Sequence, residues 1–298
     1  MNAFLERLGF SPEERVVIFH ADDLGMCHAM NEAFMDIVAQ GMLRTGSVMV
    51  PCPWFPELAT FARKNADALD VGVHLTLNSE WHTYRWGPIS TRDPASGLLD
   101  AEGYLWRDTE ALHAHMDAEA AASELRAQIE QALAAGVDVT HIDTHMGSVL
   151  HPSLALVYIG LAQEYRIPAM LPRLSVAELM EMGIAQDLAE MFVGMLSRLE
   201  ESGTLPVVDH LRLLETPTTN NRWEQYAEVL HALPPGLTHC VYHAARPGPE
   251  IQAIAPDWPM RVADYQIFAG EQFTRLVQET GVKVLRYRDL RDLMRAGS

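Results

Sequence analysis

Short apolar runs rich in β-branched residues alternate along the chain with longer stretches in which apolar residues recur at helical spacing. The short runs predict strands at residues 15–20, 46–51, 70–77, 138–143, 168–173, 206–210, 237–243 and 282–286. The longer stretches predict helices over residues 28–40, 117–135 and 152–165, and two further helices over 175–201 and 260–279. Strands that alternate with helices in this way are typical of βα units and predict a parallel sheet.

The number of βα units bears on the fold class, which we expect to be α/β. Seven or eight units in a chain of 298 residues favour a (β/α) barrel over an open, doubly wound sheet. Neither GxGxxG nor GxxxxGKS/T follows the first strand, so a nucleotide-binding fold is not indicated. We expect residues 1–298 to form a single barrel domain, because no linker, repeat or low-complexity tract divides the chain.

The segment of residues 78–110 departs from this rhythm. It contains proline, glycine and charged residues without a clear period, and loops of this length inside a compact domain are usually functional or disordered. Its aromatic residues argue against disorder and leave two interpretations open. The aromatic side chains either pack onto the barrel, or they form a sugar-stacking or lid surface. In the second interpretation, Trp81, Tyr84 and Trp86 are the candidate substrate-binding residues.

Composition narrows the class of partner. Hydrophobic residues make up 48% of the chain, and the formal net charge of −18 argues against a nucleic-acid or anionic membrane surface. The three cysteines, Cys27, Cys52 and Cys240, lie far apart and predict no disulfide framework. We find no signal-peptide pattern and no apolar run of about eighteen residues, so a soluble cytoplasmic protein without a membrane span is expected. A homo-oligomer is compatible with the sequence.

Polar side chains gather where the predicted strands end. Active sites of (β/α) barrels are built at the C-terminal ends of their strands. The polar residues there are His20, Asp22 and Asp23 for the first strand, His74 for the third, His141, Asp143 and His145 for the fourth, Asp209 and His210 for the sixth, and His243 for the seventh. Imidazole and carboxylate groups that converge at one rim are what a divalent metal requires.

Taken singly, these strand-end residues have simpler interpretations. A histidine inside an apolar strand, such as His74, is more often a buried core residue than a ligand. His141 alternates with an apolar neighbour and fits the barrel wall. The carboxylates Asp143 and Asp209 are equally compatible with a helix cap and a turn.

Two adjacent carboxylates, Asp22 and Asp23, follow the apolar first strand in "VVIFHADDLGM". Like charges at the end of a buried segment repel each other, so the pair requires an explanation. If one carboxylate binds a cation, the other stays ionised beside it and can act as a base on water that the cation acidifies. The alternative is that one aspartate faces solvent and the other caps the helix that begins near residue 28.

Three segments together resemble a known family. "HADDLGMCHAMNEAF", "DVGVHLTLN" and "THIDTH" are similar, in order and spacing, to the signature segments of the YdjC family of carbohydrate deacetylases, which includes chitooligosaccharide deacetylase. The resemblance implies a barrel of the glycoside hydrolase/deacetylase type and a divalent metal held by one Asp and two His. On this chain it implies Asp23, His74 and His145 as the metal ligands. It implies Asp22 as the base and His243 as an acid or oxyanion partner.

The sequence departs from the family pattern at two places. "MGS" follows Asp-x-His where the family commonly has further histidines, and the late His-Pro-Gly element appears as "HAARPG". The ligand set survives both changes. The substrate pocket is expected to differ, so chitooligosaccharides in particular are not assigned as the substrate.

The function that follows is metal-dependent removal of an acetyl group from a small N-acetylated sugar or oligosaccharide. Mg or Zn is the expected cation, and Asp143 and Asp209 are expected to orient the ligand or acid histidines. A non-haem iron oxygenase is an alternative, because two histidines and a carboxylate are also its ligand set. A non-catalytic sugar-binding protein on the same scaffold is another, although the intact Asp22 and Asp23 argue against it.

Overall fold

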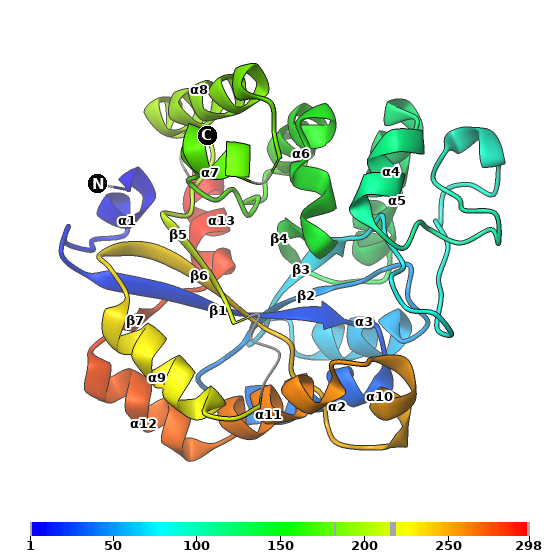
Figure 1. Cartoon of the computed structure of the whole chain (residues 1–298). Helices are drawn as coiled ribbons and strands as arrows, with labels where there is room; N and C mark the ends of the chain where they lie inside the picture. The colour runs from blue at the N-terminus through cyan, green and yellow to red at the C-terminus, as the bar shows by residue number, and fades with distance from the viewer. Residues whose placement is uncertain (1, 182, 215–218, 297–298) are drawn as a thin grey trace.

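The structure is a computed structural model that describes residues 2–181, 183–214 and 219–296. Its strands are β1 (Arg15–Leu24), β2 (Thr45–Val48), β3 (Asp70–Leu75), β4 (Val139–Thr144), β5 (His210–Leu213), β6 (Gly236–Tyr242) and β7 (Lys283–Val284). All pairings between these strands are parallel. The order is β4-β3-β2-β1-β6-β5, with β7 also paired to β1 (Figure 1).

Two isolated bridges connect β4 back toward β5. Ile142 of β4 bridges Ala169, and Pro172 bridges Val208. These bridges lie within residues 168–173 and 206–210, where the fifth and sixth strands were predicted. Proline has no N–H, so Pro168 and Pro172 remove donors that a continuous ladder would need. The parallel strands are thereby linked around a ring, and the α/β barrel class predicted from the sequence is confirmed.

The helices surround the strands (Figure 1). They are α1 (Ala3–Arg7), α2 (His28–Ala39), α3 (Phe55–Lys64), α4 (Thr109–His115), α5 (Ala118–Ala134), α6 (Pro152–Tyr165), α7 (Val176–Glu181), α8 (Gln186–Ser202), α9 (Arg222–Ala232), α10 (Pro249–Ile254), α11 (Trp258–Phe268), α12 (Glu271–Thr280) and α13 (Tyr287–Ala296). Two short 3₁₀ helices are η1 (Pro94–Ser96) and η2 (His145–Leu150). Among the described residues, no helix has the length and apolarity that a membrane crossing requires.

Three predicted helices are present within a few residues as α2, α5 and α6, whereas two others are each divided. The helix predicted over 175–201 is α7 followed by α8, with Gly183 between them at φ +86°. The helix predicted over 260–279 is α11 followed by α12, with Gly270 at the break. Glycine has little preference for a helical backbone, so the helix is interrupted at both places.

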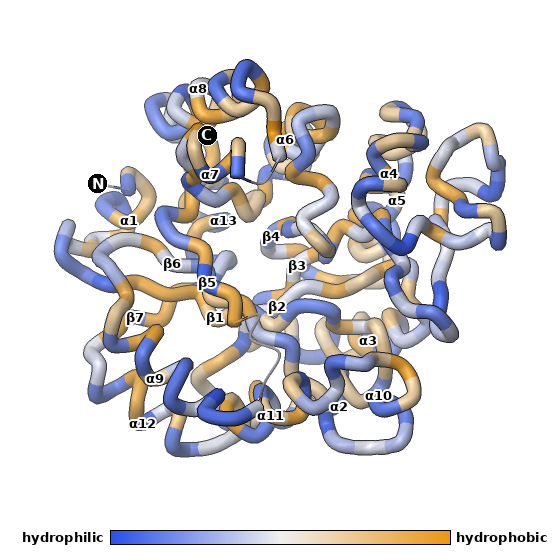
Figure 2. Tube along the Cα trace, viewed as in Figure 1, coloured by the Kyte–Doolittle hydropathy of each residue, from blue (hydrophilic) through white to orange (hydrophobic). Residues whose placement is uncertain are grey.

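Apolar residues, orange in Figure 2, are frequent in the strands at the centre of the fold. These strands separate two apolar clusters. Val17 and Phe19 of β1 belong to the large cluster under the outer helices, while Val16 and Ile18 belong to a smaller one. This alternation follows from the two-residue period of a strand. The smaller cluster also contains residues of α1 and α13, namely Phe4, Leu5, Tyr287 and Leu290. Helices α1 and α13 therefore close the N-terminal end of the barrel. The polar side chains of the site lie at the opposite end, where the strands end.

Candidate metal centre and active site

An irregularity at the end of β1 allows both adjacent aspartates to reach one site. Neighbouring residues on a regular strand point to opposite faces. Between Ala21 and Leu24 the register against β2 shifts, and Asp23 has a left-handed backbone at φ +61°. Such bulges re-aim side chains, and aspartate tolerates positive φ better than most residues. Asp22 and Asp23 are consequently both buried beside the same histidine, His74.

Asp23 lies between two imidazoles contributed by different strands. Its Oδ1 is 3.3 Å from Nε2 of His74, on β3, and 3.2 Å from Nδ1 of His145, directly after β4. Atoms from the three side chains lie within 4.8 Å of one another. All three residues are at most 4% exposed. The three residues implied as metal ligands by the family resemblance are thus brought together.

Each of these histidines is oriented by a second carboxylate. Nδ1 of His74 lies 2.9 Å from Oδ2 of Asp143, and Nε2 of His145 lies 2.9 Å from Oε2 of Glu80. A neutral imidazole that donates one N–H presents the lone pair of its other nitrogen. Nε2 of His74 and Nδ1 of His145 are therefore the nitrogens with free lone pairs, and both face Asp23. Sequence reasoning did not identify Glu80, which lies in the long loop without any periodic signal.

A divalent cation fits this geometry. Oδ1 of Asp23 is buried and has no hydrogen-bond partner of normal geometry. Buried carboxylate oxygens are ordinarily hydrogen-bonded, so the exception requires a reason. Two imidazole nitrogens and one carboxylate oxygen are a common donor set for Zn and related cations. The unpartnered oxygen and the two free lone pairs are suited to share a cation.

Electrostatics keep the carboxylate of Asp23 ionised. Burial opposes the charge, but the Arg261 guanidinium, 2.8 Å from Oδ2, and the two histidines hold the pKa of Asp23 well below its usual range. Arg261 is itself held by Asp257 at 3.0 Å and lies 5.7 Å from the centre of the Trp81 ring. No sequence signal pointed to Arg261, which comes from α11.

The carboxylates act in turn on the imidazoles. Burial lowers the pKa of His74, but Asp143 and the other nearby carboxylates outweigh it and raise that pKa well above its ordinary value. Burial also opposes protonation of His145, while Glu80 and Asp23 raise its pKa to about 9. Protons on these rings and a bound cation compensate the same negative charge. A cation therefore competes with protons for this site.

Asp22 and His243 flank the open side of the cluster. Oδ1 of Asp22 is 2.5 Å from Nδ1 of His20, and Oδ2 faces Nε2 of His74 at 3.9 Å. His243 follows β6, and its Nε2 is 3.9 Å from Oδ2 of Asp23. The side chains of Asp22 and His243 are 12% and 28% exposed, against 3% for Asp23. An approaching molecule can therefore touch both of these groups.

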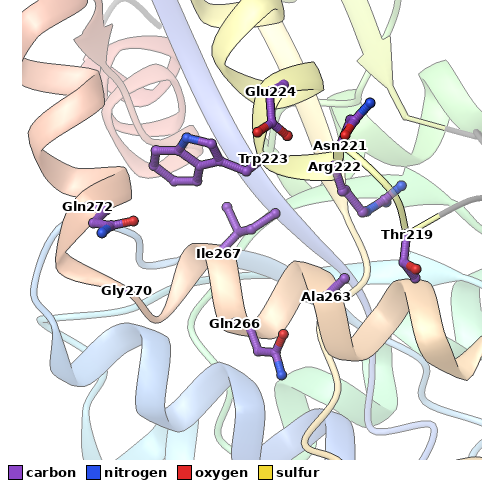
Figure 3. A pocket seen from close by; sticks show the side chains of 10 residues that line it. All are labelled: Thr219, Asn221, Arg222, Trp223, Glu224, Ala263, Gln266, Ile267, Gly270 and Gln272. Atoms are coloured by element: carbon purple, nitrogen blue, oxygen red, sulfur yellow. The ribbon is translucent and has the colours of Figure 1, made fainter.

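A buried network behind His243 fixes its backbone. Its N–H donates to Oδ2 of Asp264, which also accepts hydrogen bonds from Arg222 and Tyr226 through its carboxylate. Arg222 begins α9 beside a surface hollow between α9 and α11, where Trp223 faces Ile267 (Figure 3). None of the residues around this hollow belongs to the carboxylate–histidine cluster. The hollow adjoins a support of the site rather than the site itself.

The loop aromatics divide between packing and exposure. Trp86 is 3% exposed, and its Nε1 donates to the carbonyl of Asn78, so the expectation that it stacks on a sugar is wrong. Trp81 and Tyr84 are only half-buried and both contact Met26. Trp81 is also the ring beneath Arg261. The packing interpretation thus holds for Trp86, whereas Trp81 and Tyr84 are partly exposed.

The expected position of Asp209 is wrong. Its backbone N–H donates to the carbonyl of Leu237, and its Oδ2 accepts from the N–H of Leu237, near the start of β6. It also binds Asn2 and Arg173. His243 lies at the other end of β6. Asp209 is therefore at the N-terminal end of the barrel and cannot orient the histidines of the site.

Residues 16–279 match the family model described as YdjC-like protein. The chain belongs to the YdjC-like family. It is 39% identical over 275 residues to a carbohydrate deacetylase of Thermus thermophilus, covering 92% of this chain and 94% of that protein. A carbohydrate deacetylase of Brevibacillus brevis is 32% identical over 156 residues, covering 52% of this chain and 59% of the relative.

A solved structure supports the fold of this YdjC-like protein. It comes from Enterococcus faecalis V583 and is described provisionally as a cellobiose-phosphate cleavage protein. The TM-score is 0.73 at 20% identity, over 93% of this chain and 99% of that one. At this identity the likeness concerns the fold alone.

Proposed function

We propose that this YdjC-like protein is a metal-dependent carbohydrate deacetylase, which acts as one domain and hydrolyses the N-acetyl group of a sugar or oligosaccharide. The observation that carries the proposal is the buried Oδ1 of Asp23, which lacks a hydrogen-bond partner and is faced by two oriented imidazole nitrogens. The names of the Thermus and Brevibacillus relatives support the substrate class.

In this proposal Asp23, His74 and His145 hold the cation, and Mg or Zn suits their oxygen and nitrogen donors. When bound, the cation supplies Lewis acidity toward the amide carbonyl and toward water. Asp143 and Glu80 keep the two imidazoles in the required tautomers. Arg261 keeps Asp23 ionised.

Asp22 and His243 supply the proton transfers. Oδ2 of Asp22 accepts a proton from the water whose oxygen attacks the acetyl carbon, as a general base does. His243, the more exposed of the pair, stabilises the oxyanion or donates a proton to the nitrogen as the C–N bond breaks. The products are acetate and the free amino sugar. In this proposal the sugar ring binds against Trp81 and Tyr84, which are partly exposed and both contact Met26.

Acetate release from a panel of N-acetylated sugars, measured with and without a chelator, tests the function. We expect release that stops when the metal is removed and returns when it is restored. Release unaffected by exhaustive chelation, with no metal in the protein, would contradict the proposal. Oxygen consumption in place of acetate release would favour an iron oxygenase.

Two neighbouring substitutions test the assignment of roles. Asp23→Asn should lose metal and activity together, because an anionic ligand becomes neutral. Asp22→Asn should keep the metal and the KM but lose roughly 10²- to 10⁴-fold in kcat, the usual range for a general base. If Asp22→Asn loses the metal while Asp23→Asn keeps it, the two roles are reversed.

A further inference from the structure

A column of buried histidines lies in the barrel interior beneath Asp22 and has no part in the mechanism above. His20, His141 and His239 are each at most 1% exposed. The rings of His20 and His239 are 4.7 Å apart, and Nδ1 of His239 is 2.8 Å from the hydroxyl of Tyr287. Burying three imidazoles in a barrel is unfavourable unless their nitrogens are paired. Every one of these rings has such a partner.

The hydrogen bonds form a continuous chain that ends on Asp22. Nδ1 of His141 is 3.0 Å from Oγ1 of Thr140, and Nε2 of His141 is 2.7 Å from Nε2 of His20. Nδ1 of His20 then lies 2.5 Å from Oδ1 of Asp22. Between two facing imidazole nitrogens only one can carry the shared proton. The protonation of His141 and His20 is therefore linked.

Two proton arrangements satisfy this chain when Asp22 is ionised. In the first, the Thr140 hydroxyl donates to His141, His141 donates to His20, and His20 is neutral. In the second, His20 carries both protons and donates to His141, whose Nδ1–H donates to Thr140. In each arrangement the Nδ1–H of His20 donates to Oδ1 of Asp22. The contact with Asp22 does not depend on which arrangement is populated.

We propose that His20 is a positioning residue for the base Asp22. Its Nδ1–H holds Oδ1, so that Oδ2, which faces Nε2 of His74, is the oxygen presented to the attacking water. The inference rests on the proposed function and names a group that acts through Asp22 without touching the substrate. A lone carboxylate at this depth could rotate and offer either oxygen; a carboxylate held at Oδ1 cannot.

The surroundings of His20 make it a rigid support. His141 is held between Gly72 and the ring of Tyr287, which stacks on it at 4.0 Å. The charged or titratable groups that surround His20 are Asp22, Asp143 at 3.8 Å, Asp70, His74, His141, His239 and Tyr287. Burial lowers the pKa of His20, but Asp143 and Asp22 outweigh it and raise that pKa. Its ring therefore keeps the proton that Asp22 requires.

The test compares two substitutions at His20 in the metal-loaded, full-length protein. His20→Leu removes the donor, whereas His20→Asn places an amide N–H close to the position of Nδ1. For His20→Leu we expect unchanged metal content, a KM within about twofold of wild type, and a kcat lower by roughly 10- to 100-fold. His20→Asn should restore most of the lost kcat without a change in KM, because its amide N–H can again hold Oδ1 of Asp22.

Tyr287→Phe is the matched control, because it removes a hydrogen bond from the same cluster without touching Asp22. It should lower stability while leaving kcat and KM at wild type. The proposal is overturned if His20→Leu keeps wild-type kcat, if Tyr287→Phe lowers kcat equally, or if His20→Asn is no better than His20→Leu.

A spectroscopic measurement separates this inference from the proposed function. Histidine-selective ¹⁵N labelling should reveal a downfield Nδ1–H signal from His20 that is lost in His20→Asn and displaced in Asp22→Asn. The signal requires no turnover. If it is present but no N-acetylated sugar releases acetate, the proposed function fails and the His20–Asp22 contact stands. If acetate is released but the signal is absent, the positioning role alone is overturned.

Discussion

Gly72→Ala tests whether the buried histidine column is as tightly held as its geometry indicates. A Cβ added at Gly72 would lie 2.5, 2.6 and 2.7 Å from three atoms of the His141 ring. Ordinary contacts between such atoms lie at about 3.5–4.0 Å, so the ring would have to retreat by about an ångström. The His141 ring cannot move away freely, because Tyr287 stacks on it at 4.0 Å and its Nε2 is hydrogen-bonded to His20 at 2.7 Å.

The magnitude follows from these contacts. Overpacking a rigid core typically destabilises a protein by about 1–3 kcal/mol. Displacing His141 also breaks a buried hydrogen bond and leaves polar atoms unpaired, at about 1–3 kcal/mol more. Because part of the overlap will relax, we expect Gly72→Ala to lower the free energy of unfolding by about 2–4 kcal/mol. For a chain of 298 residues this corresponds to a Tm lower by roughly 3–6 °C.

Urea and thermal unfolding followed by circular dichroism provide the measurement, with Gly160→Ala as the control. Gly160 is exposed on α6, and a Cβ there would meet nothing within 4 Å. The same chemical change should therefore stabilise the protein by about 0.5–1 kcal/mol at Gly160. If Gly72→Ala unfolds within about 0.5 kcal/mol of wild type, the ring of His141 is free to move and the histidine column is not tightly held.

Three further predictions follow from the site and its surroundings. Glu80→Ala should weaken metal affinity by about 10- to 100-fold in a chelator competition, because His145 loses its orienting carboxylate. Glu102→Ala in the same loop should leave the affinity unchanged, and equal affinities of the two variants would contradict the role of Glu80. Trp86→Ala should lower the free energy of unfolding by about 3–5 kcal/mol, whereas Trp81→Ala should mainly raise KM for the sugar. The reverse result would make Trp81 the packing residue and Trp86 the sugar-binding one. Burial lowers the pKa of His239 from 6.5 to about 3, so between these pH values the unfolded chain binds a proton that the folded chain does not. The free energy of unfolding therefore falls as the pH decreases from 6.5 toward 3, by up to about 1.4 kcal/mol per pH unit. His239→Asn should flatten the fall in stability between about pH 6 and pH 4 in urea titrations, and an unchanged slope would show that His239 is not a buried neutral group.

Local pattern in the sequence determined the architecture and the centre of the site. Periodicity reports which face of each element is buried. It predicted β1 to β4, β6, β7 and the helices α2, α5 and α6, and it predicted α7–α8 and α11–α12 each as one helix. Because parallel strands end at the same rim, the predicted strands favoured a shared site for Asp22, Asp23, His74 and His243. The irregularity at the end of β1, which turns both aspartates toward that site, is a feature of the fold. His145 follows the fourth strand directly, so it reached the same rim.

The partners of these residues, by contrast, depend on how distant segments pack in the folded chain. Glu80 comes from an irregular loop and Arg261 from a helix far along the chain, and no period in either segment relates them to Asp23 or His145. Asp209 was expected at the same rim, but its backbone pairs with the beginning of β6, at the opposite end of the barrel. The register between strands, like the choice of which loop aromatic is buried, depends on packing between segments that are distant in sequence. The amino-acid pattern carries the propensity of each segment, and the contacts between segments exist only in the folded chain.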